Sequence, residues 1–240
     1  ILASIASMMA DKANFAGTYI IVALAWVCSL ASLTVLKTGR PRPVEIEVPP
    51  ETLYDVADVE LLEEGKYERP GGSVESIKKG AELIAAAKNP LLWAGGGVIS
   101  AEASSELTAI AEFLQAPVIT TGEGRGAISD RSHLSIGSFR FKNDTFFENH
   151  IDDHDLVIAV GTRLAYPEFL KGQKVLQIDI DEEEIGRNYD NTEGILGDAK
   201  KSLDSLLEAL KARMEAKESR IEELSKIKEE RFNPSTHIEP

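Results

Sequence analysis

Three consecutive glycines, Gly95, Gly96 and Gly97, follow the apolar stretch NPLLWA and precede a helix-prone segment. In the dinucleotide-binding pattern G-x-G-x-x-G, the third glycine would stand where this chain has Ser100. Glycine lets a backbone approach a phosphate closely, and the first N–H groups of a following helix bind anions. A tight turn between a strand and a helix also favours glycine. The stretch therefore predicts a phosphate contact or a turn.

Two later apolar runs end in residues that suit a nucleotide. DLVIAVG ends at Gly161 and is followed closely by Arg163, whose guanidinium can bind a phosphate. KVLQIDID contains Asp179 and Asp181, whose carboxylates can accept hydrogen bonds from ribose hydroxyls. Open α/β sheets bind their ligands at the carboxyl ends of the strands, where these residues fall. The alternative is a pair of turn-capping acids and a surface arginine.

Three other segments hold less specific candidates. The loop TTGEGRGAISD can approach a ligand or serve as a mobile connection, and GDAK offers Asp198 as a helix cap or as a contact to adenine or ribose. His150 and His154 stand four residues apart, but no third metal ligand follows at an obvious position. The sequence contains no nucleophile–base pair, nucleophile elbow or P-loop. It indicates binding, with no catalytic residue and no metal site.

Strands and helices alternate from residue 73 onward. Helices are predicted at 73–88, 100–115, 143–154 and 202–213, with Ser73 or Ser76 capping the first and Ser100 or Ser104 the second. Strands are predicted at 90–96, 116–121, 155–161, 174–181 and near 193–198, with a glycine-containing loop at 122–142. Nearly continuous apolar strands are typical of a parallel sheet buried on both faces. We therefore predict an α/β fold, a doubly wound parallel sheet with flanking helices.

The composition limits the partners and the location of the chain. Its formal net charge is −14 over 240 residues, so the chain as a whole repels nucleic acid and anionic lipid. Cys28 is the only cysteine, which excludes an internal disulfide and fits a reducing, cytoplasmic compartment.

The two ends of the chain differ from its middle. Residues 13–36 carry no charge and are long enough to cross a bilayer as a helix, and the alternative is a buried helix of a soluble protein. Residues 214–232 are rich in charges and have a thin apolar seam. This pattern predicts one helix continuing from the preceding one, docked on its own domain or contacting another chain.

Six segments, in this order, resemble the thiamine-diphosphate-dependent enzymes of the acetolactate synthase type. They are GRPRPVEIEVP, KNPLLWAGGGV, APVITTGEGRGAISD, DLVIAVGTR, LQIDIDEEEIGR and GDAKKSLDSLL. The resemblance implies that 74–213 is the nucleotide-type central domain. Residues 1–50 would be the tail of the N-terminal pyrimidine-binding domain, 51–73 a linker, and 214–240 a charged helix and linker towards a C-terminal domain. It also makes 13–36 a helix of the first domain rather than a membrane span.

The resemblance further implies a function for the full enzyme. Such enzymes bind thiamine diphosphate and Mg and join or split the carbon skeletons of 2-oxo acids. The catalytic glutamate and GDG…N regions of the family are missing from this sequence, so a structural fragment is expected. Its expected partners are the remaining domains of the same enzyme and further copies, as a dimer or tetramer. The alternative is a stand-alone nucleotide-binding regulatory module, with or without a membrane anchor.

The central domain of these enzymes holds FAD, ADP or no nucleotide. The segment GSFRFKND departs from the GMHG-like element of the flavin-binding members, so FAD, another adenine nucleotide and an empty site all remain open. The positions matching the family's FAD contacts are Gly95, Gly96, Gly97, Thr120, Thr121, Gly161, Arg163, Asp179, Ile180 and Asp198.

Overall fold

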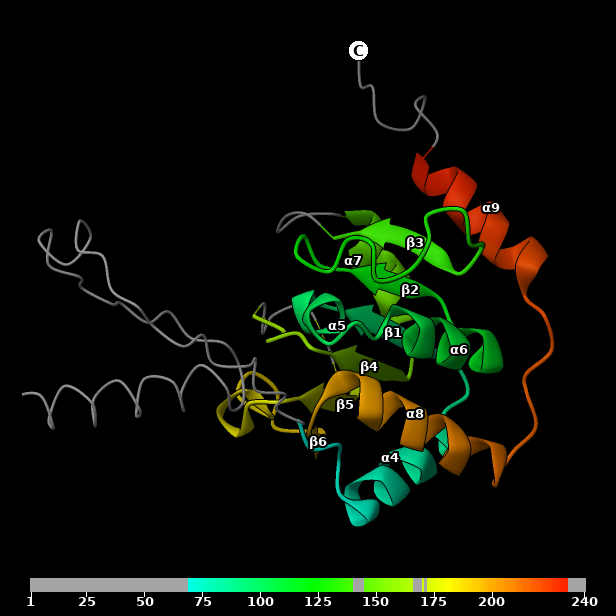
Figure 1. Ribbon diagram of the computed structural model, residues 1–240. Helices are drawn as coiled ribbons and strands as arrows, with labels where there is room; N and C mark the ends of the chain where they lie inside the picture. The colour runs from blue at the N-terminus through cyan, green and yellow to red at the C-terminus, as the bar shows by residue number, and fades with distance from the viewer. Residues whose placement is uncertain (1–68, 140–144, 166–169, 171, 233–240) are drawn as a thin grey trace, which may run out of the picture. The chain divides into compact units, whose positions relative to one another are not determined.

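The computed structural model describes residues 69–139, 145–165, 170 and 172–232, and Pro70–Pro240 is one compact unit of the chain. Six strands form a parallel sheet in the order β3-β2-β1-β4-β5-β6 (Figure 1). They are β1 (Pro90–Ala94), β2 (Val118–Thr120), β3 (Ser135–Ser138), β4 (Leu156–Val160), β5 (Lys174–Asp179) and β6 (Thr192–Leu196). The order runs outward in both directions from β1 and β4, which is the topology of a doubly wound sheet. The predicted fold class is confirmed.

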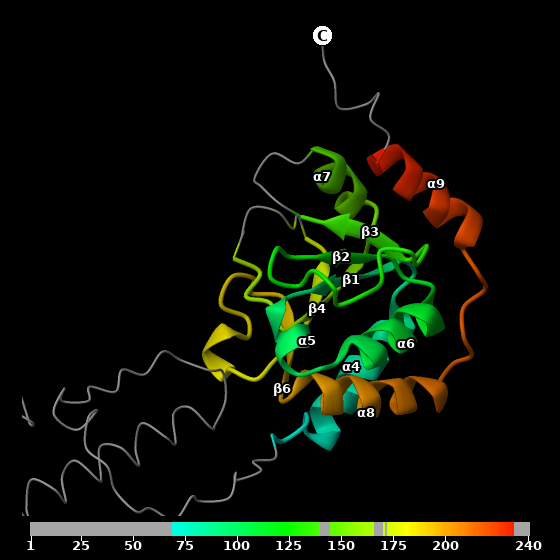
Figure 2. The ribbon, with the colours of Figure 1, turned by 45° about the horizontal axis from the view of Figure 1, so that its top comes forward.

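Both faces of the sheet are buried. Successive side chains of a strand face opposite sides, so Leu92 and Ala94 of β1 contact one apolar core, and Leu91 and Trp93 contact the other. Figures 1 and 2 show the helices on the two sides. The first core packs against α4 (Val74–Ala86), α5 (Gly96–Ser100), α6 (Ser104–Leu114) and α8 (Ala199–Lys211), and the second against α7 (Thr145–Asp152). This double burial explains why the central strands β1 and β4 are continuous apolar runs.

The start of the first predicted helix is correct, and the start of the second is not. Ser73 caps α4, since its side chain accepts a hydrogen bond from the Ser76 N–H. The helix expected over 100–115 begins only at Ser104, as α6, and a separate short helix, α5, ends at Ser100. Glu102 between them adopts a left-handed conformation (φ 53°), which a continuous right-handed helix cannot contain. The cap prediction was wrong as well, because α6 has Ala103 at its N-cap position.

Strand β3 lies inside the segment expected to be only a loop. It is four residues long and pairs with β2 at the edge of the sheet, with an irregular register between Val118 and Ile119. Gly137 in β3 has a φ of 109°, and a Cβ atom there would lie 2.9 Å from the Phe232 ring. Such a short strand, SIGS, lacks an apolar run. Its pairing with a neighbouring strand, and not its own sequence, makes it a strand.

The charged C-terminal segment is not a continuation of α8, so that prediction was wrong. Residues 212–220 separate α8 from α9 (Ile221–Phe232), and within them the Lys217 N–H donates to the Phe113 carbonyl. Leu224 of α9 is fully buried, and the Arg231 guanidinium lies 4.7 Å from the centre of the Phe147 ring. The expectation that this helix docks on its own domain is therefore confirmed.

Two histidines at the end of α7 are packed among aromatic and charged groups. The His154 ring, 4% exposed, lies 5.2 Å from the His150 ring, and its Nδ1 is 2.9 Å from the His150 carbonyl. Both Nε2 atoms are buried without a hydrogen-bond partner. Across the described residues no cluster of three or more His, Cys, Asp or Glu side chains could hold a metal ion. The pair is thus part of the packing of α7.

The apolar run 13–36 lies outside the described residues. Of the helices that the structure describes, none has the length and hydrophobicity needed to cross a membrane.

We predict that His154 makes the fold sensitive to acid. Burial lowers the pKa of His154 to about 4. The hydrogen bond to the His150 carbonyl and the charge of Asp153 oppose this lowering, and the charges of His150 and Arg220 add to it. Because the unfolded chain binds the proton more tightly, stability should fall as the pH drops from about 6.5 to about 4, by roughly 3 kcal/mol. Urea unfolding across this pH range measures the effect.

The variant His154→Gln should flatten that part of the pH dependence. Equal pH slopes in the wild type and His154→Gln would contradict the role assigned to His154.

Candidate functional site

All ten predicted site residues lie at the carboxyl edge of the sheet. Gly95–Gly97 follow β1, Thr120 and Thr121 end β2, Gly161 and Arg163 follow β4, Asp179 and Ile180 end β5, and Asp198 follows β6. The strand order reverses between β1 and β4, and doubly wound sheets bind their ligands at this switch point. The fold thus brings candidates that are distant in sequence to one edge.

The glycines after β1 and β4 pack against each other through their backbones. A Cβ atom on Gly95 would lie 2.2 Å from the Gly161 carbonyl oxygen, and one on Gly97 would lie 2.6 Å from the Gly161 Cα. Gly161 itself has a φ of 58°, and the Gly97 N–H donates to its carbonyl at 3.0 Å. No side chain fits at these three positions. The tight-turn alternative therefore explains Gly95 and Gly97 without any ligand.

The connection after β2 joins the same cluster of turns. The Thr121 N–H donates to the Ala94 carbonyl, and the Thr121 hydroxyl accepts a hydrogen bond from the Gly124 N–H at 3.1 Å. A Cβ atom on Gly124 would lie 2.3 Å from the Ala94 carbonyl oxygen. The Thr120 side chain is buried and that of Thr121 is half-buried. The loop TTGEG thus covers the end of β1, close to the three glycines.

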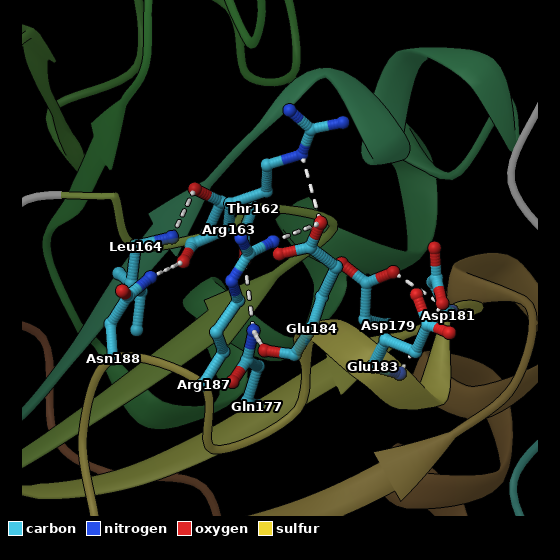
Figure 3. Close-up of polar contacts among 10 residues, drawn as sticks. All are labelled: Thr162, Arg163, Leu164, Gln177, Asp179, Asp181, Glu183, Glu184, Arg187 and Asn188. Atoms are coloured by element: carbon cyan, nitrogen blue, oxygen red, sulfur yellow. Dashed lines mark hydrogen bonds and ion pairs between the residues drawn. The ribbon is translucent and has the colours of Figure 1, made fainter. Parts of the chain in front are cut away.

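Gln177 on β5 ties the turn after β4 to the connection that follows β5 (Figure 3). Its side-chain amide donates to the carbonyls of Thr162 and Glu184, at 3.1 and 3.0 Å, and accepts a hydrogen bond from the Gly186 N–H at 3.0 Å. The Asn188 side chain donates to the Arg163 carbonyl at 2.8 Å. The backbone on both sides of Arg163 is therefore held by the β5–β6 connection.

The predicted phosphate ligand Arg163 is paired with an acid that the sequence did not single out. Its Nε lies 3.3 Å from Oε1 of Glu184, and the same oxygen lies 3.3 Å from Nη1 of Arg187. The Glu184 side chain is 8% exposed, whereas those of the two arginines are 60% and 62% exposed. One signal was available in the sequence, because EEEIGR directly follows the predicted strand. Which of three glutamates is buried could not be read from it.

The two aspartates after β5 have different surroundings. Asp179 is buried, and its Oδ1 accepts a hydrogen bond from the Asp181 N–H at 3.0 Å. Asp181 precedes a short 3-10 helix, Glu182–Glu184, and caps it by accepting from the Glu183 N–H. The turn-capping alternative therefore describes Asp181. Asp179 remains the candidate for a ribose contact at the end of β5.

Asp198 caps α8, which is one of the two roles predicted for it. The other predicted role is a contact to adenine or ribose. Its carboxylate accepts a hydrogen bond from the Lys201 N–H, and its own N–H donates to the Pro70 carbonyl. A Cβ atom on the preceding Gly197 would lie 2.5 Å from the Gly71 backbone. Residues 70–72 thus lie directly against this end of β6.

A separate cavity of about 930 Å³ lies between α9 and the residues around β3. It includes Thr120 but none of the other nine predicted site residues. The two imidazoles of His150 and His154 also lie apart from the carboxyl edge, at the end of α7 that precedes β4.

The carboxyl edge offers one buried acceptor and one exposed donor. The Asp179 carboxylate is an acceptor of the type that ribose hydroxyls require, and the Arg163 guanidinium is a donor of the type that phosphate requires.

The fold and this edge define the class of protein, a doubly wound α/β domain with candidate ligand groups at the carboxyl ends of its strands. Two solved structures share the fold. Benzoylformate decarboxylase from Polynucleobacter necessarius is 24% identical, with a TM-score of 0.55 over 69% of this chain and 31% of that one. A putative thiamin diphosphate-dependent enzyme from Mycobacterium smegmatis is 25% identical, with a TM-score of 0.53 over 65% and 32%.

The family follows from the sequence comparison. The model of the thiamine pyrophosphate enzyme central domain matches residues 77–206, and the chain belongs to this family. It is 35% identical to a probable acetolactate synthase large subunit of Methanocaldococcus jannaschii, over 82% of this chain and 36% of the relative. It is 33% identical to a glyoxylate carboligase of Escherichia coli, over 72% and 31%.

The chain thus spans about a third of the length of the curated relatives it matches. The resemblance to the acetolactate synthase type, stated from six segments of the sequence, is confirmed.

We predict that Gly161→Ala destabilises the domain. The left-handed φ and the contact with the Gly97 backbone should together lower the free energy of unfolding by about 2 kcal/mol or more. Gly122→Ala is the matched control, because no atom lies within 4 Å of a Cβ atom there, and its change should stay within about 0.5 kcal/mol. Urea unfolding measures both. Similar values for the two variants would refute the proposed interlock.

Removing the cap of α8 should weaken the fold without involving a ligand. Asp198→Ala is expected to cost about 1 kcal/mol of unfolding free energy, whereas Asp198→Asn keeps an acceptor for the Lys201 N–H and should cost less. Asp204→Ala, on the exposed side of the same helix, serves as the control. If Asp198→Ala unfolds at the same urea concentration as the wild type, the side chain is not an effective cap.

Proposed function

We propose that this domain binds an adenine nucleotide across the carboxyl edge of its sheet, with FAD as the favoured ligand. One observation carries the proposal. The candidates that end β2 and β5 are separated by three strand spacings, roughly 14 Å, with the candidates of β1 and β4 between them. Only an extended ligand can contact both ends of such a row, and a dinucleotide is extended in this way.

Each group of residues has a role in this proposal. Asp179 binds the ribose of the adenosine half, Arg163 binds phosphate, and Thr120 and Thr121 lie at the flavin end. Gly95–Gly97 and Gly161 keep the backbone at the switch point free of side chains, so that the ligand can cross it. In the full enzyme, FAD would act as a redox cofactor or would have a structural role. This chain would bind and orient it.

The full enzyme is proposed to join or split 2-oxo acids with thiamine diphosphate and Mg bound by its other domains. Its activity and substrate would follow those of acetolactate synthase, because several of its relatives are acetolactate synthases. The proposed partners are those other domains and further copies of the chain, as a dimer or tetramer. A reducing, cytoplasmic location is supported by the single cysteine, Cys28.

The absorption spectrum of the purified protein, with mass spectrometry of any released ligand, tests the proposal first. Calorimetry with FAD and ADP follows, and FAD should bind more tightly because it reaches both ends of the edge. Asp179→Asn retains the acceptor for the Asp181 N–H but loses the charge, so it should weaken binding of both nucleotides by roughly tenfold.

Asp204→Asn makes the same charge change on the exposed side of α8 and should bind both nucleotides as the wild type does. A folded, colourless protein that binds neither FAD nor ADP would show that the edge is an empty site.

A further inference from the structure

The buried carboxylate of Glu184 holds two arginines at the carboxyl edge, between β4 and the β5–β6 connection. Both contacts are made to a single oxygen, Oε1, at 3.3 Å. The contacting nitrogens of Arg163 and Arg187 are therefore no more than 6.6 Å apart, which is the sum of the two distances. Two guanidinium groups this close repel each other, and the carboxylate between them offsets that repulsion.

The orientation of Arg163 leaves its outer nitrogens available. Arg163 contacts Glu184 through Nε, so its two terminal nitrogens point away from the carboxylate, as Figure 3 shows. In the same view, the Asp179–Asp181 turn lies on the other side of Glu184 from Arg187. Both arginine side chains are more than half exposed. The pair therefore presents guanidinium N–H groups to solvent at the edge where a nucleotide would lie.

The frame beneath the pair is rigid. Glu184 is the last residue of the short 3-10 helix, its carbonyl accepts from the buried Gln177 amide, and Gln177 also binds the Thr162 carbonyl. Asn188 holds the Arg163 carbonyl from the other side. Positions of both arginines are thus set by hydrogen bonds between two segments that are distant in sequence. Such preorganisation reduces the cost of ordering long side chains when a ligand binds.

We infer that Arg163 and Arg187 together bind the diphosphate of the nucleotide, and that Glu184 is the positioning residue that holds them there. Guanidinium groups suit phosphate oxygens because they donate in pairs from a planar fork. The cluster of two cations and one anion keeps one excess positive charge, in a chain whose formal net charge is −14. The inference rests on the proposed nucleotide site, and it adds Arg187 and Glu184 to it.

Calorimetry of the purified protein with ADP, FAD and adenosine tests the inference. Arg187→Gln should weaken ADP and FAD about tenfold, in line with the loss of one charge-assisted contact, and leave adenosine within about twofold. The dependence of ADP affinity on salt should become shallower. Arg213→Gln is the matched control, since Arg213 also pairs with a glutamate, Glu82, but at the C-terminal end of α8.

The variant Glu184→Gln tests the role of Glu184 through the direction in which the ADP affinity changes. Removing a negative charge should tighten binding of an anion if charge alone matters. A positioning role requires the opposite, a weaker affinity for ADP with adenosine unchanged. The variant Arg187→Lys retains the charge but not the planar guanidinium, so it should recover part of the ADP affinity lost in Arg187→Gln. It also keeps the test available if a glutamine variant fails to fold.

The outcomes separate the two proposals. A wild-type protein that binds neither FAD nor ADP overturns both the nucleotide site and the role of this pair. Wild-type binding that Arg187→Gln leaves unchanged overturns the inference and leaves the nucleotide site standing. Tighter ADP binding by Glu184→Gln overturns the positioning role of Glu184.

Discussion

The contact between the backbones of Gly97 and Gly161 is the constraint on which the carboxyl edge depends. The turns after β1 and β4 meet at the point where the strand order reverses, and neither could move apart without breaking the hydrogen bond from the Gly97 N–H to the Gly161 carbonyl. The loop after β2 then packs on Ala94 at the end of β1. Three connections are therefore held by close backbone packing, which only glycine allows.

A second set of bonds extends this frame to β5. Gln177 is buried between two carbonyls and an N–H, and so ties the Arg163 turn to the 3-10 helix that carries Glu184. A buried amide with its hydrogen bonds made specifies one arrangement, since any other would leave polar atoms unsatisfied. The position of Arg163 and Glu184 at this edge thus depends on Gln177 of β5, the strand next to β4.

The long apolar strands and amphipathic helices could be predicted because burial on both faces imposes a pattern on the residues themselves. The failures have a common cause. β3 is a strand only because β2 pairs with it, and the nine residues after α8 leave the helix to bond with Phe113 and Lys88. Local propensity cannot report such contacts, which form between segments distant in sequence.

The sequence by itself determined the α/β class, the family and the placement of all ten candidate residues at strand ends, because periodicity, motif order and glycine positions can be read along the chain. Only the tertiary structure decided why Gly95 and Gly97 must be glycine, that α9 returns to the domain, and that Glu184, out of three consecutive glutamates, is buried between two arginines. Burial and close approach depend on neighbours that the linear order of residues does not reveal.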